Sequence, residues 1–236
     1  MTTPARARYT GYRFPVEIIG HAVWLYFRFP LGLRMVDELL AARGIIVSHE
    51  TVRQWARKFG QQFANQIRRR LPRAGDKWHL DEVVLKISGV KHWLWRAVDQ
   101  SGMVLEVLVQ RRRDKRAAKR LLRKLLKKQM RAPLVMITDK LASYGAAKRE
   151  VMLSIEHRQH KGLNNRAENS HQPTRRRERQ MKQFKSAGQA QRFLSAHDQI
   201  NNLFHVRCDH VTAAEHRASR SQSFHLWAEI CGIGVA

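Results

Sequence analysis

The spacing of apolar residues changes near residue 71, and this change constrains the fold more than any other feature of the sequence. Upstream of it, apolar residues recur at helical intervals. Downstream lie three runs rich in Val, Leu, Ile and Trp, at residues 77–87, 91–99 and 103–110. The segments between these runs contain Gly89 and Gly102, which suits hairpin turns. We therefore predict three antiparallel strands after a helical region, with a boundary in the turn-rich segment 71–76.

The residues after the third run alternate between helical and strand-like patterns. Residues 111–131 hold twelve Lys or Arg and one acid, Asp114, while leucines keep a helical apolar stripe. A short apolar run at 134–137 suits a buried strand, and a helix, a short strand near 155–158 and a long helix around Glu168 are expected after it. The order β-β-β-α-β-α-β-α is that of the ribonuclease H-like fold. We therefore predict an α/β domain of retroviral-integrase type with a mixed five-stranded sheet.

The N-terminal region is predicted to be a small all-α domain of helix-turn-helix type. A helix over residues 34–43 is followed by Gly44, and Ser48 is placed to cap the next helix. The outer face of that next helix carries residue types that contact bases and phosphates in a major groove. These candidate DNA-binding residues are His49, Arg53, Gln54, Arg57 and Lys58. A plain three-helix packing unit shows the same periodicity and is the alternative.

Charge is the second constraint. The chain has 45 Lys and Arg against 19 Asp and Glu, a formal net charge of +26 that is spread along its length. Such a balance predicts a polyanionic partner. A further basic run, from residue 175 to residue 185, also suits a solvated helix face. Its candidate DNA contacts are Arg175, Arg176, Arg179 and Lys182.

Neither a membrane protein nor a secreted disulfide framework is expected. No segment approaches the roughly 18 apolar residues that span a bilayer, and the N-terminus lacks a signal-like apolar run. The two cysteines, Cys208 and Cys231, have no CxxC spacing. The histidines within 157–160 and 205–210 lack the four-ligand spacing of a zinc site. We therefore expect a cytoplasmic protein.

Three acids lie in different sequence contexts, and the predicted fold brings them together. Asp81 lies in the first strand, Asp139 follows the fourth, and Glu168 lies on a helix. The first and fourth strands are neighbours in this fold, so their acids can approach each other. Carboxylates so placed can hold two Mg²⁺ ions, or Mn²⁺, that activate a water or a 3′-hydroxyl for in-line displacement at phosphorus. Glu82 and Asp99 are rivals for the role of first acid, and periodicity does not choose between them.

Eight short segments form a specific set. They are residues 78–82 (Trp-His-Leu-Asp-Glu), 93–99, 138–140, 144–145, 156–158, 164–169 (Asn-Asn-Arg-Ala-Glu-Asn), 177–179 and 181–184. In these segments the chain resembles bacterial DDE transposases of the insertion sequence six family, over nearly its whole length. The resemblance implies that Asp81, Asp139 and Glu168 form the metal-binding catalytic triad. It also implies that Arg175, seven positions after Glu168, contacts DNA near the active site.

The same resemblance implies a function. Such a transposase binds the terminal inverted repeats of an insertion sequence, cleaves at the element ends and joins the 3′-hydroxyl to target DNA in a replicative, cointegrate-forming reaction. Because two ends must be paired, a homodimer or larger assembly is expected, in the bacterial cytoplasm and associated with the nucleoid. The expected domains are the helix-turn-helix domain at 1–70, the catalytic domain at 71–200 and a helical tail at 201–236. A non-catalytic DNA-binding repressor and a nuclease that only hydrolyses DNA are the alternatives.

Four further residues have competing interpretations. Trp93 and Trp95 share one face of the second strand, where burial in the core is favoured over stacking on a base. Asn164 and Asn165 precede the Glu168 helix, and capping of that helix is favoured over contact with a scissile phosphate.

Overall fold

The chain divides into two compact units. The computed structural model describes residues 8–205 and 211–234. One unit contains residues 1–71 together with 196–236, and the other contains residues 72–195. Cys208 and His210 lie outside the described residues. In the two described ranges, no helix is both long enough and apolar enough to cross a membrane.

The first unit is a helical bundle around three N-terminal helices. Its helices are α1 (Val16–Arg28), α2 (Leu33–Ala41), α3 (His49–Arg70), α9 (Ala213–Cys231) and the last part of α8 (Ala187–Leu203). Apolar residues of α3 at helical spacing enter its core, since Val52, Trp55 and Phe59 are at most 2% exposed. The helical pattern predicted upstream of residue 71 is therefore confirmed as three helices.

The connection between α2 and α3 is the tight turn that the sequence predicts. Gly44 has a φ of 74°, in the left-handed region that favours glycine. The Ile45 N–H donates to the Leu40 carbonyl at 3.0 Å, one of the two hydrogen bonds of a Schellman motif. Ser48 then caps α3, because its side chain accepts from the Thr51 N–H. Local sequence therefore fixes the helix, the turn and the start of the next helix.

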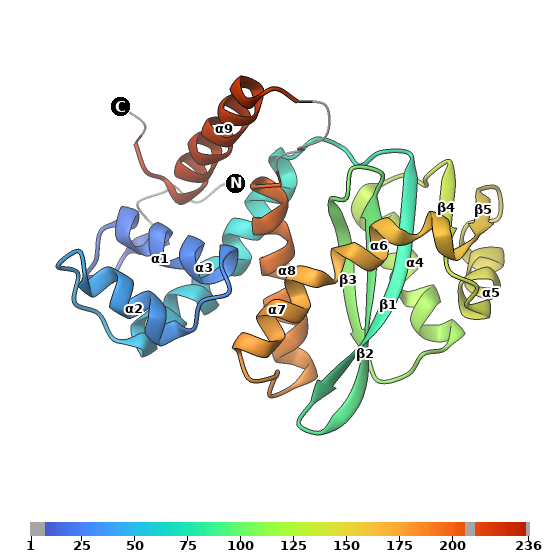
Figure 1. Cartoon of the computed structure of the whole chain (residues 1–236), viewed down its shortest axis with the longest axis horizontal. Helices are drawn as coiled ribbons and strands as arrows, with labels where there is room; N and C mark the ends of the chain where they lie inside the picture. Colours follow the sequence, from blue (N-terminus) through green and yellow to red (C-terminus); the bar gives the residue numbers. More distant parts are fainter. Residues whose placement is uncertain (1–7, 206–210, 235–236) are drawn as a thin grey trace. The chain divides into compact units, whose positions relative to one another are not determined.

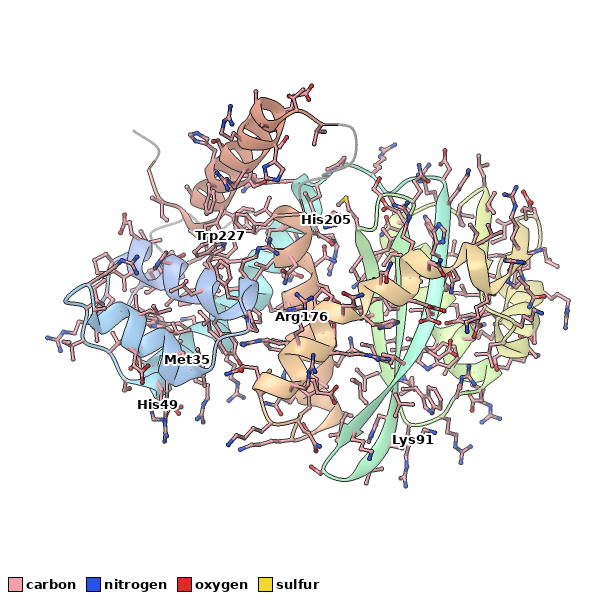
Figure 2. All side chains as sticks on the ribbon, viewed as in Figure 1. Met35, His49, Lys91, Arg176, His205 and Trp227 are labelled. Atoms are coloured by element: carbon pink, nitrogen blue, oxygen red, sulfur yellow. The ribbon has the colours of Figure 1, made fainter. Side chains whose placement is uncertain are left out.

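The last helix packs on α1 and α3 through aromatic and small residues. Trp227 of α9 is 5% exposed, its ring lies 5.3 Å from that of Phe63 between centroids, and Figure 2 shows it pointing into the bundle. Gly20 of α1 permits this approach, because a Cβ there would lie 2.9 Å from the Cys231 Sγ. The Tyr9 hydroxyl donates to the Cys231 carbonyl at 2.7 Å. These contacts make the end of the chain part of the N-terminal bundle.

The second unit contains a mixed sheet. Its strands are β1 (Lys77–Ile87), β2 (Val90–Asp99), β3 (Val104–Gln110), β4 (Val135–Thr138) and β5 (Glu156–Gln159), in the order β3-β2-β1-β4-β5. β1, β2 and β3 pair antiparallel, while β4 pairs parallel with both β1 and β5. Ser88 and Gly89 both have positive φ, as a two-residue type I′ hairpin turn requires. The predicted ribonuclease H-like fold with its mixed five-stranded sheet is confirmed.

Helices cover both faces of this sheet. On one face, α4 (Lys115–Gln129) and α5 (Ala142–Val151) bury leucines and Tyr144 against Trp78, Leu80 and Trp95. On the other face, the short 3-10 turn η2 (Lys161–Leu163) leads into α6 (Asn165–Ser170), which crosses the sheet in Figure 1, and into α7 (Gln172–Gln180). Trp95 is completely buried, so its core assignment is confirmed. Thus α4 and α5 cover one face of the sheet, and α6 covers the other.

The single long helix predicted around Glu168 is wrong, because the chain forms two helices there. α6 ends at Ser170 and α7 begins at Gln172. Pro173 lies at the start of α7, where its missing N–H is tolerated. Inside one continuous helix the same proline would leave the Asn169 carbonyl without its donor. Glu168 and Arg175 therefore lie on successive helices.

Candidate active site

Strand register places two of the predicted acids side by side. β1 and β4 run parallel, with Leu80 beside Thr138. Asp81 follows Leu80, and Asp139 follows Thr138. Both aspartates are partly exposed. The fold thus brings Asp81 and Asp139 to the place where β4 ends, on adjacent strands.

Asp81 is held from the side of the sheet that α6 covers. The Nε2 atom of His171, the residue between α6 and α7, lies 3.2 Å from the Asp81 Oδ2, and His171 is 3% exposed. Across the β1–β2 pairing, Asp81 lies opposite Arg96, which is 1% exposed. Arg96 donates to the Ser170 carbonyl and, at 2.6 Å, to the Thr174 hydroxyl. The break between α6 and α7 is therefore fastened to the strands beside Asp81.

Asp139 is held by the backbone that follows it and by one cation. Its Oδ1 accepts a hydrogen bond from the Leu141 N–H at 3.0 Å, and its Oδ2 lies 3.7 Å from the Arg113 Nη2. The preceding residue, Thr138, is completely buried, and its hydroxyl lies 2.9 Å from the His157 Nε2. Burial lowers the pKa of His157, which favours its neutral form. Both sides of Asp139 are thus fixed.

Glu168 lies on α6 and is exposed. α6 is tied to β1 by Asn164, which is completely buried and donates from Nδ2 to the Leu80 carbonyl at 2.9 Å. Asn164 occupies the N-cap position of α6 as predicted, but its side chain makes no capping bond there. Its bond instead fixes the start of the Glu168 helix to the residue before Asp81. Among residues 8–205 and 211–234, no three Asp, Glu, His or Cys side chains are close enough to hold a metal ion together.

The two rivals for the first acid have other partners. Glu82 points to the α4 and α5 side, and its Oε1 accepts from the Arg113 Nε at 2.7 Å and Nη2 at 2.5 Å. Burial raises the pKa of Glu82, and the hydrogen bonds from Arg113 oppose this shift. Asp99 is 3% exposed and accepts from backbone N–H groups at Ser101 and Met103. Both rivals therefore have structural contacts, which leaves Asp81 as the accessible acid of β1.

Several residues of this site had no distinct signal in the sequence. Arg113 stands in a run of basic residues, yet it alone contacts both Glu82 and Asp139 and lies 4.9 Å from the Trp93 ring centroid. His171 has no motif of its own, since its contact with Asp81 depends on the bend between two helices. Only the tertiary fold distinguishes these residues from their neighbours.

The candidate DNA-binding residues occupy two exposed surfaces, one in each unit. On α3, Arg53, Gln54, Arg57 and Lys58 are exposed and His49 is half-buried, 4.0 Å from an Asp37 oxygen. The exposed residues of the second surface are Arg175, Arg176, Arg179 and Lys182. Figure 2 labels His49 on the first and Arg176 on the second. Arg177 differs from its neighbours, because it is 1% exposed and lies 5.3 Å from the Phe193 ring centroid.

Asn164→Ala is expected to destabilise the second unit by about 1–3 kcal/mol, because it deletes a buried hydrogen bond. The exposed neighbour Asn165 is the matched control, and Asn165→Ala is expected to change stability by less than about 0.5 kcal/mol. Urea unfolding followed by circular dichroism measures both. Equal stability of the two variants would contradict the role of Asn164 as the tie between α6 and β1.

The chain matches known proteins over this region. Residues 75–207 match a family model described as a DDE domain. The transposase for insertion sequence element IS257 in transposon Tn4003 of Staphylococcus aureus is 32% identical over 168 residues, which cover 67% of this chain and 73% of that protein. The transposase for insertion sequence-like element IS431mec of Staphylococcus aureus strain Mu50 has the same identity and coverage. The solved HTLV-2 integrase catalytic core domain is 21% identical, with a TM-score of 0.34, and covers 42% of this chain and 68% of that chain.

Proposed function

Since this chain belongs to the DDE transposases of insertion sequences, we propose that it binds the terminal inverted repeats of its element, cleaves at the ends and joins the freed 3′-hydroxyl to target DNA. We further propose that the reaction is replicative and forms cointegrates. The observation that carries the proposal is the register of β1 and β4, which places Asp81 and Asp139 on adjacent strands. Glu168 completes the proposed catalytic triad from α6, whose start is tied to the residue before Asp81.

The donor set fits a divalent metal of the hard, oxygen-binding kind. Asp81, Asp139 and Glu168 offer only carboxylate oxygens, which suit Mg²⁺ and Mn²⁺ better than zinc. Like-charged carboxylates in one site repel one another unless a cation lies between them, so their approach depends on the metal. When bound, the metal supplies activation of the attacking oxygen and stabilisation of the leaving oxygen. Mg²⁺ is the proposed ion, with Mn²⁺ as a substitute.

The residues around the triad have distinct proposed roles. His171 and Arg113 orient the carboxylates of Asp81 and Asp139, from distances of 3.2 and 3.7 Å. The cations of the α7 region hold the DNA strand by its phosphates, so that the scissile bond stays in line with the attacking oxygen. These cations are Arg175, Arg176, Arg179 and Lys182.

The helix-turn-helix of the first unit is the proposed reader of the inverted repeats. A helix that enters the major groove contacts base edges with residues near its N-terminus. The candidate contact residues lie within the first ten positions of α3 and are His49, Arg53, Gln54, Arg57 and Lys58. Lys58 also lies 4.4 Å from the Tyr12 ring centroid, which restricts its side chain. Because two element ends must be paired, we propose that the enzyme works as a homodimer or larger assembly on the bacterial nucleoid in the cytoplasm.

A strand-transfer assay tests this function. The native chain, Mg²⁺, a duplex carrying the terminal repeats of the element and a supercoiled target plasmid are incubated together. We expect covalently joined product, and none when a chelator removes the metal. Cut DNA without joined DNA would indicate a nuclease, and repeat binding without either product would indicate a repressor. Both of these results contradict the proposal.

A further inference from the structure

The cations of α4 fall into two groups that differ in their partners. One group consists of lysines on the two flanks of the helix. Lys115 and Lys119 form ion pairs with Glu150 of α5. On the opposite flank, Lys124 and Lys128 form ion pairs with Glu106 of β3, at 2.8 Å for Lys124. Each of these lysines thus has an ion-pair partner within the protein, and each of the two carboxylates is shared by two lysines.

The second group forms a ridge between these flanks, opposite the buried face of the helix. Its members are Arg116, Arg120, Arg123 and Lys127, all exposed. Their spacing of four, three and four residues places them on one face. Within the described residues, none of their side chains has a hydrogen-bond or ion-pair partner. The ridge is about 16 Å long, which corresponds to about five base-pair steps of DNA.

A cavity adjoins the N-terminal end of this ridge. Its volume is about 330 Å³, and because its lining is mostly arginine it suits a phosphate group rather than a large apolar ligand. Four arginines line it: Arg111, Arg112, Arg116 and Arg120. The one acid in its lining, Asp114, caps α4 by accepting from the Ala117 N–H at 2.9 Å. The guanidinium groups are therefore left for an external anion.

The cavity lies next to the proposed active site along the chain. Arg112 lines it, and the next residue, Arg113, lies 3.7 Å from the carboxylate of Asp139. Arginine forks match phosphate oxygens in pairs, which makes this lining suited to a sugar-phosphate backbone.

We propose that the ridge and cavity of α4 bind the backbone of target DNA, independently of its base sequence. This inference rests on the proposed function, because it requires two different DNA partners. The ridge offers only cations, and contacts from cations to phosphates carry no sequence information. Element ends must be recognised by their base sequence, whereas a protein surface that contacts only the DNA backbone accepts DNA of any sequence. The ridge and cavity therefore suit the target better than the element ends.

The test compares two double variants of the same helix. Arg116→Gln with Arg120→Gln removes two charges that have no partner among the described residues, whereas Lys115→Gln with Lys119→Gln removes two that are ion-paired with Glu150. Fluorescence anisotropy of the full chain measures binding to a random-sequence duplex across a range of salt concentrations. We expect the arginine variant to bind roughly tenfold more weakly and its salt slope to fall by about 1.8, at about 0.9 for each lost phosphate contact. The lysine variant is expected to bind within about twofold of the native chain.

Binding to a terminal-repeat duplex and target titration in strand transfer complete the test. We expect repeat binding by the arginine variant to remain near native, and the target concentration for half-maximal joining to rise roughly tenfold. Native binding of random duplex by this variant, or an equal loss of repeat binding, overturns the inference. If the double variant does not fold, Arg120→Gln alone is measured against Lys119→Gln. The binding measurements need no catalysis. If the native chain joins no DNA, the proposed function is wrong, but the binding measurements still test this inference.

Discussion

Asp81→Asn, Asp139→Asn and Glu168→Gln are each expected to lower the rate of strand transfer by about 10³-fold or more. Each change keeps the side-chain shape but removes a carboxylate charge that the metal requires. Metal ions contribute several kcal/mol of charge stabilisation in the transition state, and about 4 kcal/mol corresponds to a factor of 10³. The joined product, quantified over time, measures the loss.

A control separates lost chemistry from lost structure. Glu156→Gln alters an exposed carboxylate of β5 whose ion pair is with Arg158, and it is expected to keep strand transfer near the native rate. Binding of all four variants to the terminal repeats is expected to remain near native. Strand transfer at the native rate by any one triad variant would remove that residue from the proposed site.

Arg113→Gln is expected to lower strand transfer by about 10–100-fold, the range found for residues that orient metal ligands. We propose Arg113 as a positioning residue, because its guanidinium contacts Glu82 at 2.5 and 2.7 Å and lies 3.7 Å from Asp139. Without it, the Asp139 carboxylate loses its fixed orientation. The Mn²⁺ concentration required for half-maximal strand transfer is therefore expected to rise by about tenfold or more.

Arg113→Lys provides the matched comparison. Lysine keeps the charge but lacks the planar fork that donates twice to Glu82, so only partial recovery is expected. Direct titration of Mn²⁺ into each variant supplies a readout that does not depend on activity. A lower melting temperature with an unchanged Mn²⁺ affinity would show that Arg113 only packs against Trp93 and Glu82.

The sequence predicts the elements of this fold well where local chemistry decides them. The runs at 77–87, 91–99 and 103–110 become strands because their Val, Leu, Ile and Trp side chains are buried in the sheet, and Ser88-Gly89 forms a hairpin turn because both residues adopt positive φ. The turn before α3 follows from Gly44 and Ser48 in the same way. Each of these features needs only neighbouring residues.

Tertiary contacts limit what the sequence can predict. The packing of α9 on the N-terminal helices depends on Gly20 and Trp227, which lie far apart in the chain. The choice between Asp81 and Glu82 depends on which face of β1 is covered by α4 and α5, because adjacent strand residues point to opposite faces. The bend between α6 and α7 is not such a tertiary effect. It depends on Pro173, a local signal that the prediction of one long helix does not take into account.

The predicted DNA-binding residues remain predictions. The sequence identifies them less precisely than it identifies the three acids. Basic residues line α3, α4 and α7 alike, and a run of charge does not show which cations have partners. On α4 the structure separates the paired lysines from the unpaired arginines. Only the positions of Glu106 and Glu150 create that difference, and both acids lie on other elements.

The most direct test of the central claim is a strand-transfer reaction with pre-cut terminal-repeat ends. Native chain and Glu168→Gln are each given Mg²⁺, a supercoiled target and an end that carries either a 3′-hydroxyl or a 3′-deoxy terminus. The account predicts joined product only from the native chain with the 3′-hydroxyl end. Joined product from Glu168→Gln, or from the 3′-deoxy end, would contradict a carboxylate-held metal site that uses the 3′-hydroxyl as nucleophile.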